Sequence, residues 1–184
     1  AVDLFGNSTS FMEFVDQLSA KGSALKLAID QLRGQDAMTA LNALLNLLFL
    51  AAGLPATVAV REEDEAARCL AGWQQGWAQR GQLDYPLALR VGAKRQSPLH
   101  RGYAEWWERL AQDLQQAAET KTVSKTKRGI KNEFTSTVEL GPAIIDWLIV
   151  LSGSGYRPLR HVATLACLHW VTGLSRLCVQ LGKE

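Results

Sequence analysis

Hydrophobic residues recur at helical spacing along most of the chain, and polar residues mark where helices begin. Ser10 and Glu13 form a capping-box pattern before a first helix, and a second short helix is expected over residues 23–33. Asp36 is placed to cap a long apolar helix over residues 37–52. The apolar face of the short helix contains Leu25, Ala28, Ile29 and Leu32. No convincing alternation of apolar and polar residues predicts a sheet.

The middle of the chain continues the helical pattern. Four acids at residues 62–65 favour the first turn of a helix on which Cys69, Trp73 and Trp77 form one stripe. Pro98 is placed to open the next helix, because its missing N–H is not needed there. That helix is expected to bury Leu99, Tyr103, Trp106 or Trp107, Leu110 and Leu114.

Two apolar segments near the end of the chain predict the last two helices. They cover residues 138–153 and 158–182, and the Gly/Ser stretch at residues 152–155 is expected to be the turn between them. Residues 121–131 have no apolar period and are predicted to form an exposed loop. The pattern therefore predicts an all-α protein of antiparallel helix pairs, either a bundle or the start of an α-solenoid.

One uncharged segment, residues 37–60, is long enough to span a bilayer. Thr39, Asn42 and Asn46 nevertheless form a polar ridge on it at helical spacing, and residues 53–55 end the helix early. The apolar part is then about four turns long. We therefore interpret this segment as the buried helix of a helical bundle.

Composition matters mainly through the distribution of charge. The chain has 184 residues, of which 47% are hydrophobic and 21% charged, and a net charge of only +2. Residues 90–101 contain four Lys/Arg and no acid, and residues 121–131 contain five and no acid. Two such segments in a nearly neutral chain indicate contact with an anionic polymer or an acidic partner. The alternative for either segment is a solvated lysine-rich loop.

Motifs for catalysis or cofactor binding are absent from the sequence. There is no Walker loop, no Rossmann glycine pattern after a strand, no HExxH and no GxSxG. The three histidines, His100, His161 and His169, are not at metal-ligand spacing, and His169 is expected to be a satisfied core residue. We therefore expect no enzyme, no cofactor, no metal and no small-molecule substrate.

The three cysteines argue against a disulfide-bonded fold. Cys167 and Cys178 share one predicted helix and lie roughly 16 Å apart along its axis, too far to bridge. Scattered and buried thiols fit a reducing compartment. Because the chain begins with neither an initiator Met nor a signal peptide, we expect it to be an internal piece of a longer protein.

Cations gather where the last helix begins, although its macrodipole is positive there. Arg157, Arg160, His161 and Thr164 have the spacing of one helix face. One interpretation is an anion site beside the free N–H groups of the first turn. The other is an ion pair with Asp146 on the preceding helix. The apolar surroundings predict burial, which favours the ion pair, because a buried Arg must be paired.

Three stretches, in order, resemble the stromalin (stromal-antigen) subunit of cohesin. "YRPLRHVATLACL", residues 156–168, is similar to the signature that opens the stromalin conservative domain. "DAMTALNALLNLLFLAAGLPATV", residues 36–58, resembles the family's Asp-led helix with its glycine turn. "LDYPLALR" and "HRGYAEWW", within residues 83–107, resemble its Asp-Tyr-Pro-Leu motif and aromatic helix. The resemblance covers roughly residues 36–170.

The resemblance implies a non-enzymatic HEAT-like α-solenoid whose basic surface holds duplex DNA for cohesin in sister-chromatid cohesion. Candidate phosphate contacts form a first basic patch of Lys94, Arg95, His100 and Arg101. A second basic patch contains Lys121, Lys125, Lys127, Arg128 and Lys131. The first patch coincides with the family's basic position, whereas the second is predicted from charge alone.

Other expectations also follow from the resemblance. The partners would be double-stranded DNA and, through the full-length protein, the kleisin subunit and cohesin regulators, with no membrane, and the location would be nuclear chromatin. We expect N-terminal helices over residues 1–35, a helical region with both basic patches over 36–135, and the start of the stromalin conservative domain over 136–184, all in one continuous unit. The alternative is a generic α-solenoid adaptor that binds a protein or peptide without contacting DNA.

Overall fold

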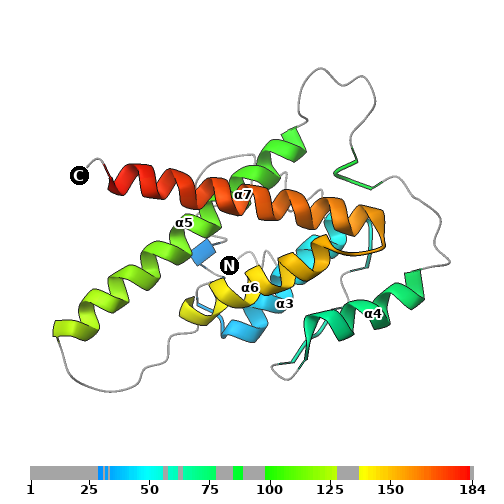
Figure 1. Cartoon of the computed structure of the whole chain (residues 1–184), viewed down its shortest axis with the longest axis horizontal. Helices are drawn as coiled ribbons and strands as arrows, with labels where there is room; N and C mark the ends of the chain where they lie inside the picture. Colours follow the sequence, from blue (N-terminus) through cyan, green and yellow to red (C-terminus); the bar gives the residue numbers. More distant parts are fainter. Residues whose placement is uncertain are drawn as a thin grey trace.

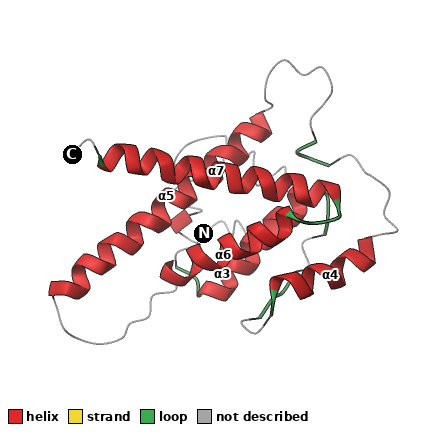
Figure 2. Cartoon of the chain, viewed as in Figure 1, coloured by secondary structure: helices red, strands yellow, loops and turns green. Residues whose placement is uncertain are grey.

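The computed structural model contains five helices in the part of the chain that it describes, and no strand there (Figures 1 and 2). The helices are α3 (Ala37–Ala51), α4 (Ala66–Trp77), α5 (Pro98–Lys127), α6 (Thr137–Ser152) and α7 (Arg157–Leu181). The structure describes residues 29–30, 32, 34–55, 58–61, 64–77, 85–88, 98–127 and 137–182, with backbone alone at 98, 119–127 and 137–139. The all-α, solenoid-like arrangement is therefore confirmed. The first predicted helix, with Ser10 and Glu13, lies outside these residues.

Helix α3 begins where the sequence predicts. The Asp36 carboxylate accepts hydrogen bonds from the Thr39 backbone N–H at 3.0 Å and from its hydroxyl at 2.6 Å, and these bonds lower the pKa of Asp36. The helix ends before Gly53, whose φ of 73° belongs to the left-handed region that glycine adopts without strain. Eight of the 15 residues of α3 are buried. The interpretation of this segment as a buried helix is confirmed.

The polar ridge on α3 holds the chain that follows the helix. Asn42 exchanges two hydrogen bonds with the backbone of Val60, at 2.7 and 3.0 Å. Asn46, one turn later, does the same with Val58, at 2.8 and 3.0 Å. Both valine side chains are buried. The two asparagines therefore attach this segment to α3. They bond the N–H and carbonyl groups of Val58 and Val60, which would otherwise be left without these partners.

Helix α4 is attached to the rest of the molecule by aromatic rings. Trp73 stacks on Trp147 of α6 with centroids 5.8 Å apart, and Phe49 of α3 contacts both Trp73 and Trp77 edge-on. The prediction that the acids lie in the first turn of this helix is wrong, since α4 begins at Ala66 after the acidic stretch. Asp64 instead accepts a hydrogen bond from the backbone N–H of Arg61.

Helix α5 packs against α7 and crosses it obliquely (Figure 1), and together with α6 these helices form much of the core. Pro98 opens α5 as predicted, and Trp106 and Trp107 are both fully buried. The expected exposed loop at residues 121–131 is wrong over its first part, because α5 continues to Lys127. Lysine has good helix propensity, and extending a helix that is already packed needs no new nucleation.

Helix α7 follows α6 through the predicted turn, and Pro158 lies in its first turn. It alone among the described helices is long and apolar enough to cross a membrane, a property shared by core helices of water-soluble proteins. Its contacts with α5 and α6 cover its buried residues, whereas Leu168, Val171, Val179 and Leu181 on the same helix are exposed. The expectation of buried thiols is wrong for Cys178, which is exposed, while Cys69 and Cys167 are partly buried.

Candidate nucleic-acid interface

A short turn, residues 85–88, is hydrogen-bonded to the first turns of both α5 and α7 and is called the bridging turn. His100 of α5 donates a hydrogen bond from its Nε2 to the carbonyl oxygen of Leu87, at 3.0 Å. On the other side, the Tyr85 hydroxyl and the Nδ1 of His161 in α7 lie 2.9 Å apart and share a hydrogen bond. The Leu87 side chain is fully buried. One histidine from each helix therefore holds the bridging turn.

The beginnings of α5 and α7 also contact each other directly. Tyr103 of α5 is buried and donates from its hydroxyl to the carbonyl oxygen of Val162 in α7, at 3.1 Å. Figure 1 shows the bridging turn next to the beginnings of both helices. Arg101, near the beginning of α5, and Arg157, at the beginning of α7, are both exposed.

The electrostatics around the bridging turn are positive. Burial lowers the pKa of His161, and the positive charges of His100 and Arg157 lower it further. Burial raises the pKa of the Tyr85 hydroxyl, and Arg157 acts against that rise by favouring the phenolate. Arg157 thus acts on both partners of the Tyr85–His161 hydrogen bond. Among the described residues, no carboxylate contributes to either shift.

The structure describes the side chains of two of the nine residues predicted to contact DNA. Arg101 is exposed, whereas His100 is partly buried and bound to Leu87. Lys121, Lys125 and Lys127 lie near the C-terminal end of α5, where the backbone alone is described. Lys94, Arg95, Arg128 and Lys131 lie outside the described residues. Because Arg101 and Lys121 are on one helix, they lie about 30 Å apart along its axis, so α5 separates the two patches.

The cations at the start of α7 do not form the expected ion pair with Asp146. Arg160 is exposed and donates to the carbonyl oxygen of Ser154 at 3.0 Å, and Asp146 is exposed on α6. The Gly/Ser turn directs this carbonyl toward the guanidinium, and an exposed Arg needs no carboxylate partner. Thr164 donates its hydroxyl to the Arg160 carbonyl at 2.8 Å. The predicted Asp146–Arg160 ion pair is therefore wrong.

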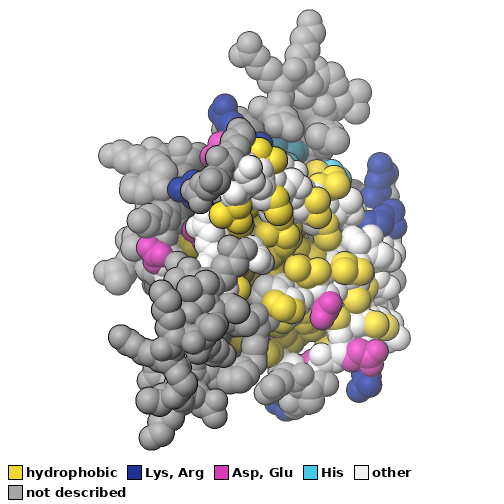
Figure 3. All heavy atoms as spheres, turned by 60° about the vertical axis from the view of Figure 1, so that its left-hand side comes forward, with side chains coloured by type: hydrophobic (Ala, Val, Ile, Leu, Met, Phe, Trp, Pro, Cys, Tyr) yellow, Lys and Arg dark blue, Asp and Glu magenta, His cyan; other side chains and the backbone are white. Residues whose placement is uncertain are grey.

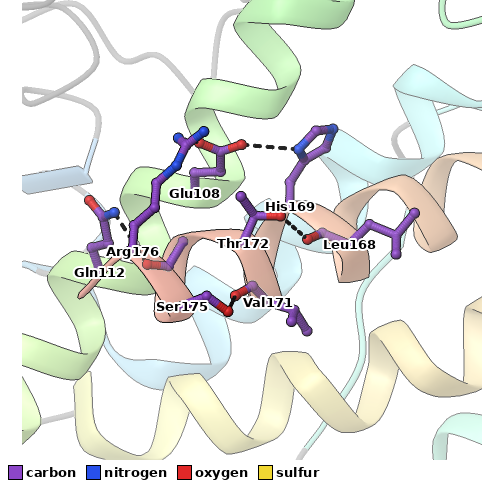
Figure 4. Close-up of polar contacts among 9 residues, drawn as sticks. Glu108, Gln112, Leu168, His169, Val171, Thr172, Ser175 and Arg176 are labelled. Atoms are coloured by element: carbon purple, nitrogen blue, oxygen red, sulfur yellow. Dashed lines mark hydrogen bonds and ion pairs between the residues drawn. The ribbon is translucent and has the colours of Figure 1, made fainter. Parts of the chain in front are cut away.

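A second polar cluster lies farther along the same two helices (Figure 4). Glu108 of α5 binds both His169, with 3.2 Å between Oε1 and Nδ1, and Arg176 of α7. Gln112 donates to the carbonyl oxygen of Gly173 at 3.2 Å. His169 has a hydrogen-bond partner, as expected, but it is only partly buried and is not the core residue that the sequence predicts. These contacts join α5 to α7, and the described residues contain no group of His, Cys, Asp and Glu suited to a metal.

The sequence interpretation missed the bridging turn itself. Tyr85 is part of the quoted "LDYPLALR" stretch, but its partner is 76 residues away in the sequence. Ser154 was assigned only to a turn, yet it is fully buried and its hydroxyl oxygen is bonded to Gln74 and to the Tyr156 N–H. No local pattern specifies either pairing.

A comparison with protein families matches residues 84–184 to the STAG domain. The match begins at the residue before Tyr85 and includes α5, α6 and α7, hence the whole contact between the bridging turn and the two helices. No curated protein and no solved structure matches the chain.

Proposed function

This chain belongs to the STAG domain family of stromalin cohesin subunits, and from that premise we propose that it helps cohesin to bind DNA. Members of this family are structural subunits of cohesin. In the proposed role, exposed Lys and Arg side chains contact phosphates, release condensed counterions and give an affinity that depends on salt and little on sequence. Sister-chromatid cohesion in the nucleus would be the process served.

The observation that carries this proposal is the positive surface around the bridging turn. Arg101, in the first basic patch, is exposed near the beginning of α5, and Arg157 is exposed at the beginning of α7. Phosphate contact needs cations that are accessible and not already paired with carboxylates. In the described part of the chain, neither Arg101 nor Arg157 has an ion pair.

We include Lys94 and Arg95 in the proposed interface because they precede His100 and Arg101 in the sequence. The second basic patch, at the far end of α5, would be a separate contact. Lys121, Lys125 and Lys127 of this patch are on α5, and Lys121 is about 30 Å from Arg101 along the helix axis, a separation that one long duplex could span.

The mobility of a non-specific DNA duplex, measured with the chain at two salt concentrations, tests the proposal. We expect binding at low salt that weakens steeply as salt rises, and a large loss of affinity when Lys94, Arg95 and Arg101 become Glu. Arg68→Glu on α4 changes another exposed cation and is the control for net charge, to be compared with Arg101→Glu alone. Absence of low-salt binding, or equal losses of affinity for Arg68→Glu and Arg101→Glu, would contradict the proposal.

A second candidate function, an adaptor for a protein partner, is favoured by a different surface. Figure 3 shows apolar side chains gathered in a broad patch on one face of the molecule. The exposed large apolar side chains of α6 and α7 are Ile149, Leu168, Val171, Val179 and Leu181. Exposed apolar surface of this kind is typical of protein contacts. Other cohesin subunits, the kleisin among them, would be such partners.

The two functions predict opposite responses to salt. Binding of a protein to an apolar face weakens little as salt rises, whereas phosphate contact weakens steeply. Leu168→Asp together with Val171→Asp should abolish capture of the purified kleisin subunit and leave DNA affinity nearly unchanged. Loss of DNA binding in the same folded variant would contradict a separate adaptor surface.

A further inference from the structure

We propose that Arg157 is a phosphate-contacting residue of the DNA interface and that His100 positions the bridging turn beside it. This inference rests on the proposed DNA-binding function and changes the roles that the sequence indicates. The sequence predicts that His100 contacts DNA and that Arg157 belongs to a structural signature. The geometry around the bridging turn points to the reverse assignment.

His100 is committed to the protein. Its Nε2 donates to the carbonyl oxygen of Leu87, and the ring is only partly exposed. Leu87 is fully buried, so the hydrogen bond fixes backbone that is already anchored in the core. A histidine held in this way positions the bridging turn, and its Nε2–H is already used and does not contact a phosphate.

Arg157 has the opposite properties. It is exposed at the first position of α7, whereas Arg160, three residues later, binds the Ser154 carbonyl. Two other arginines have carboxylate partners: Arg68 pairs with Glu65, and Arg176 pairs with Glu108. Within the described residues, Arg157 has no such partner. Its five N–H donors therefore remain available to an incoming anion.

Arg157 lies close enough to the bridging turn for its charge to act on the pKa of Tyr85 and of His161. His161, one turn farther along α7, is tied to the bridging turn through Tyr85, and the same turn is tied to His100. The Tyr103–Val162 hydrogen bond fixes the two helix beginnings against each other. Arg101 and Arg157 thus lie near two helix beginnings that these hydrogen bonds hold together, and in the proposed interface both contact phosphates of one duplex.

The salt dependence of DNA binding tests the role of Arg157. We expect Arg157→Gln to weaken binding several-fold at low salt and to reduce the slope of log K against log salt by about 1, since each phosphate contact contributes about 0.9. Its thermal midpoint should match that of the unmodified chain, because the side chain is exposed and unpaired. Arg160→Gln is the matched control, which should lower the thermal midpoint and leave the slope unchanged.

The role of His100 has a separate readout. His100→Ala should lower the thermal midpoint and weaken DNA binding with an unchanged salt slope, since no phosphate contact is removed. His100→Gln should restore much of both, because the Gln amide can donate to the Leu87 carbonyl. A slope reduced by about 1 in both His100 variants would overturn the positioning role.

The outcomes separate this inference from the function on which it rests. Unchanged affinity and slope for Arg157→Gln, with clear losses for Arg101→Gln, would overturn the role of Arg157 and leave DNA binding by the first patch standing. Failure of the unmodified chain to bind duplex at low salt would contradict the proposed function, and the inference with it.

Discussion

Gly173 of α7 lies against the backbone of Glu108 of α5, so closely that a Cβ on Gly173 would come 2.4 Å from the Glu108 carbonyl oxygen. The same Cβ would lie 2.8 Å from the Glu108 Cα. Because the atoms in its way are backbone atoms, no side chain can turn aside to make room. This close approach lets α5 and α7 pack tightly where the Glu108 carboxylate also binds His169 and Arg176.

Gly173→Ala should therefore destabilise the fold. Overpacking typically costs about 1–3 kcal/mol, and it outweighs the gain of up to about 1 kcal/mol that Ala brings to a helix interior. Chemical denaturation measures the difference. Gly72→Ala on α4 is the matched control, since a Cβ there meets nothing within 4 Å, and it should be neutral or stabilising. Equal stability of the Gly173 variant and the unmodified chain would contradict this helix packing.

The Glu108 carboxylate should contribute more to stability than either of its partners. It is only 12% exposed, whereas the Arg176 side chain is 61% exposed. Glu108→Ala leaves the partly buried His169 without its acceptor and should cost about 1–3 kcal/mol. Arg176→Ala removes an exposed ion pair and should cost less than about 1 kcal/mol. Thermal unfolding of both variants checks the order, and a larger loss for Arg176→Ala would contradict it.

The two asparagines of α3 should fix the chain at residues 58–60. Asn42→Ala leaves the N–H and the carbonyl of Val60 without their side-chain partner, at a cost of about 1–3 kcal/mol. Hydrogen exchange at the Val60 amide should become faster, while exchange at the Val58 amide, held by Asn46, changes less. Unchanged protection of the Val60 amide in the variant would show that this pairing is not formed in solution.

Features set by neighbouring residues could be predicted from the sequence. The Asp36 cap, Pro98 at the start of α5 and the turn before α7 depend on residues within one or two turns of each other. The end of α5 could not be predicted in this way, because no local pattern marks it. Residues 121–127 lack an apolar face, and a solvated helix does not need one once the earlier part of the same helix is packed.

The candidate site was harder to predict because tertiary packing creates it. The sequence indicates that Arg157, His161 and Arg160 share a helix face, but it does not show which groups approach that face. The carbonyl that binds Arg160 comes from the turn, and the hydroxyl that binds His161 comes from a segment 76 residues earlier. Only the fold decides which of these cations is paired and which remains available.

His161 should make stability depend on pH near neutrality. Its folded-state pKa is lowered from 6.5, first by burial and then by the charges of His100 and Arg157. The unfolded chain therefore binds a proton more readily, so this contribution to stability is present above pH 6.5 and is lost as pH falls through the lowered pKa. NMR titration of the ring should give a midpoint below 6.5, and His161→Gln should lose less stability than the unmodified chain between pH 7.5 and pH 5 (from about 1 unit above to about 1.5 units below the ordinary pKa). Tyr85→Phe is the control, because it removes the hydrogen bond and keeps the titrating ring. A midpoint above 6.5 would contradict the positive surroundings of His161.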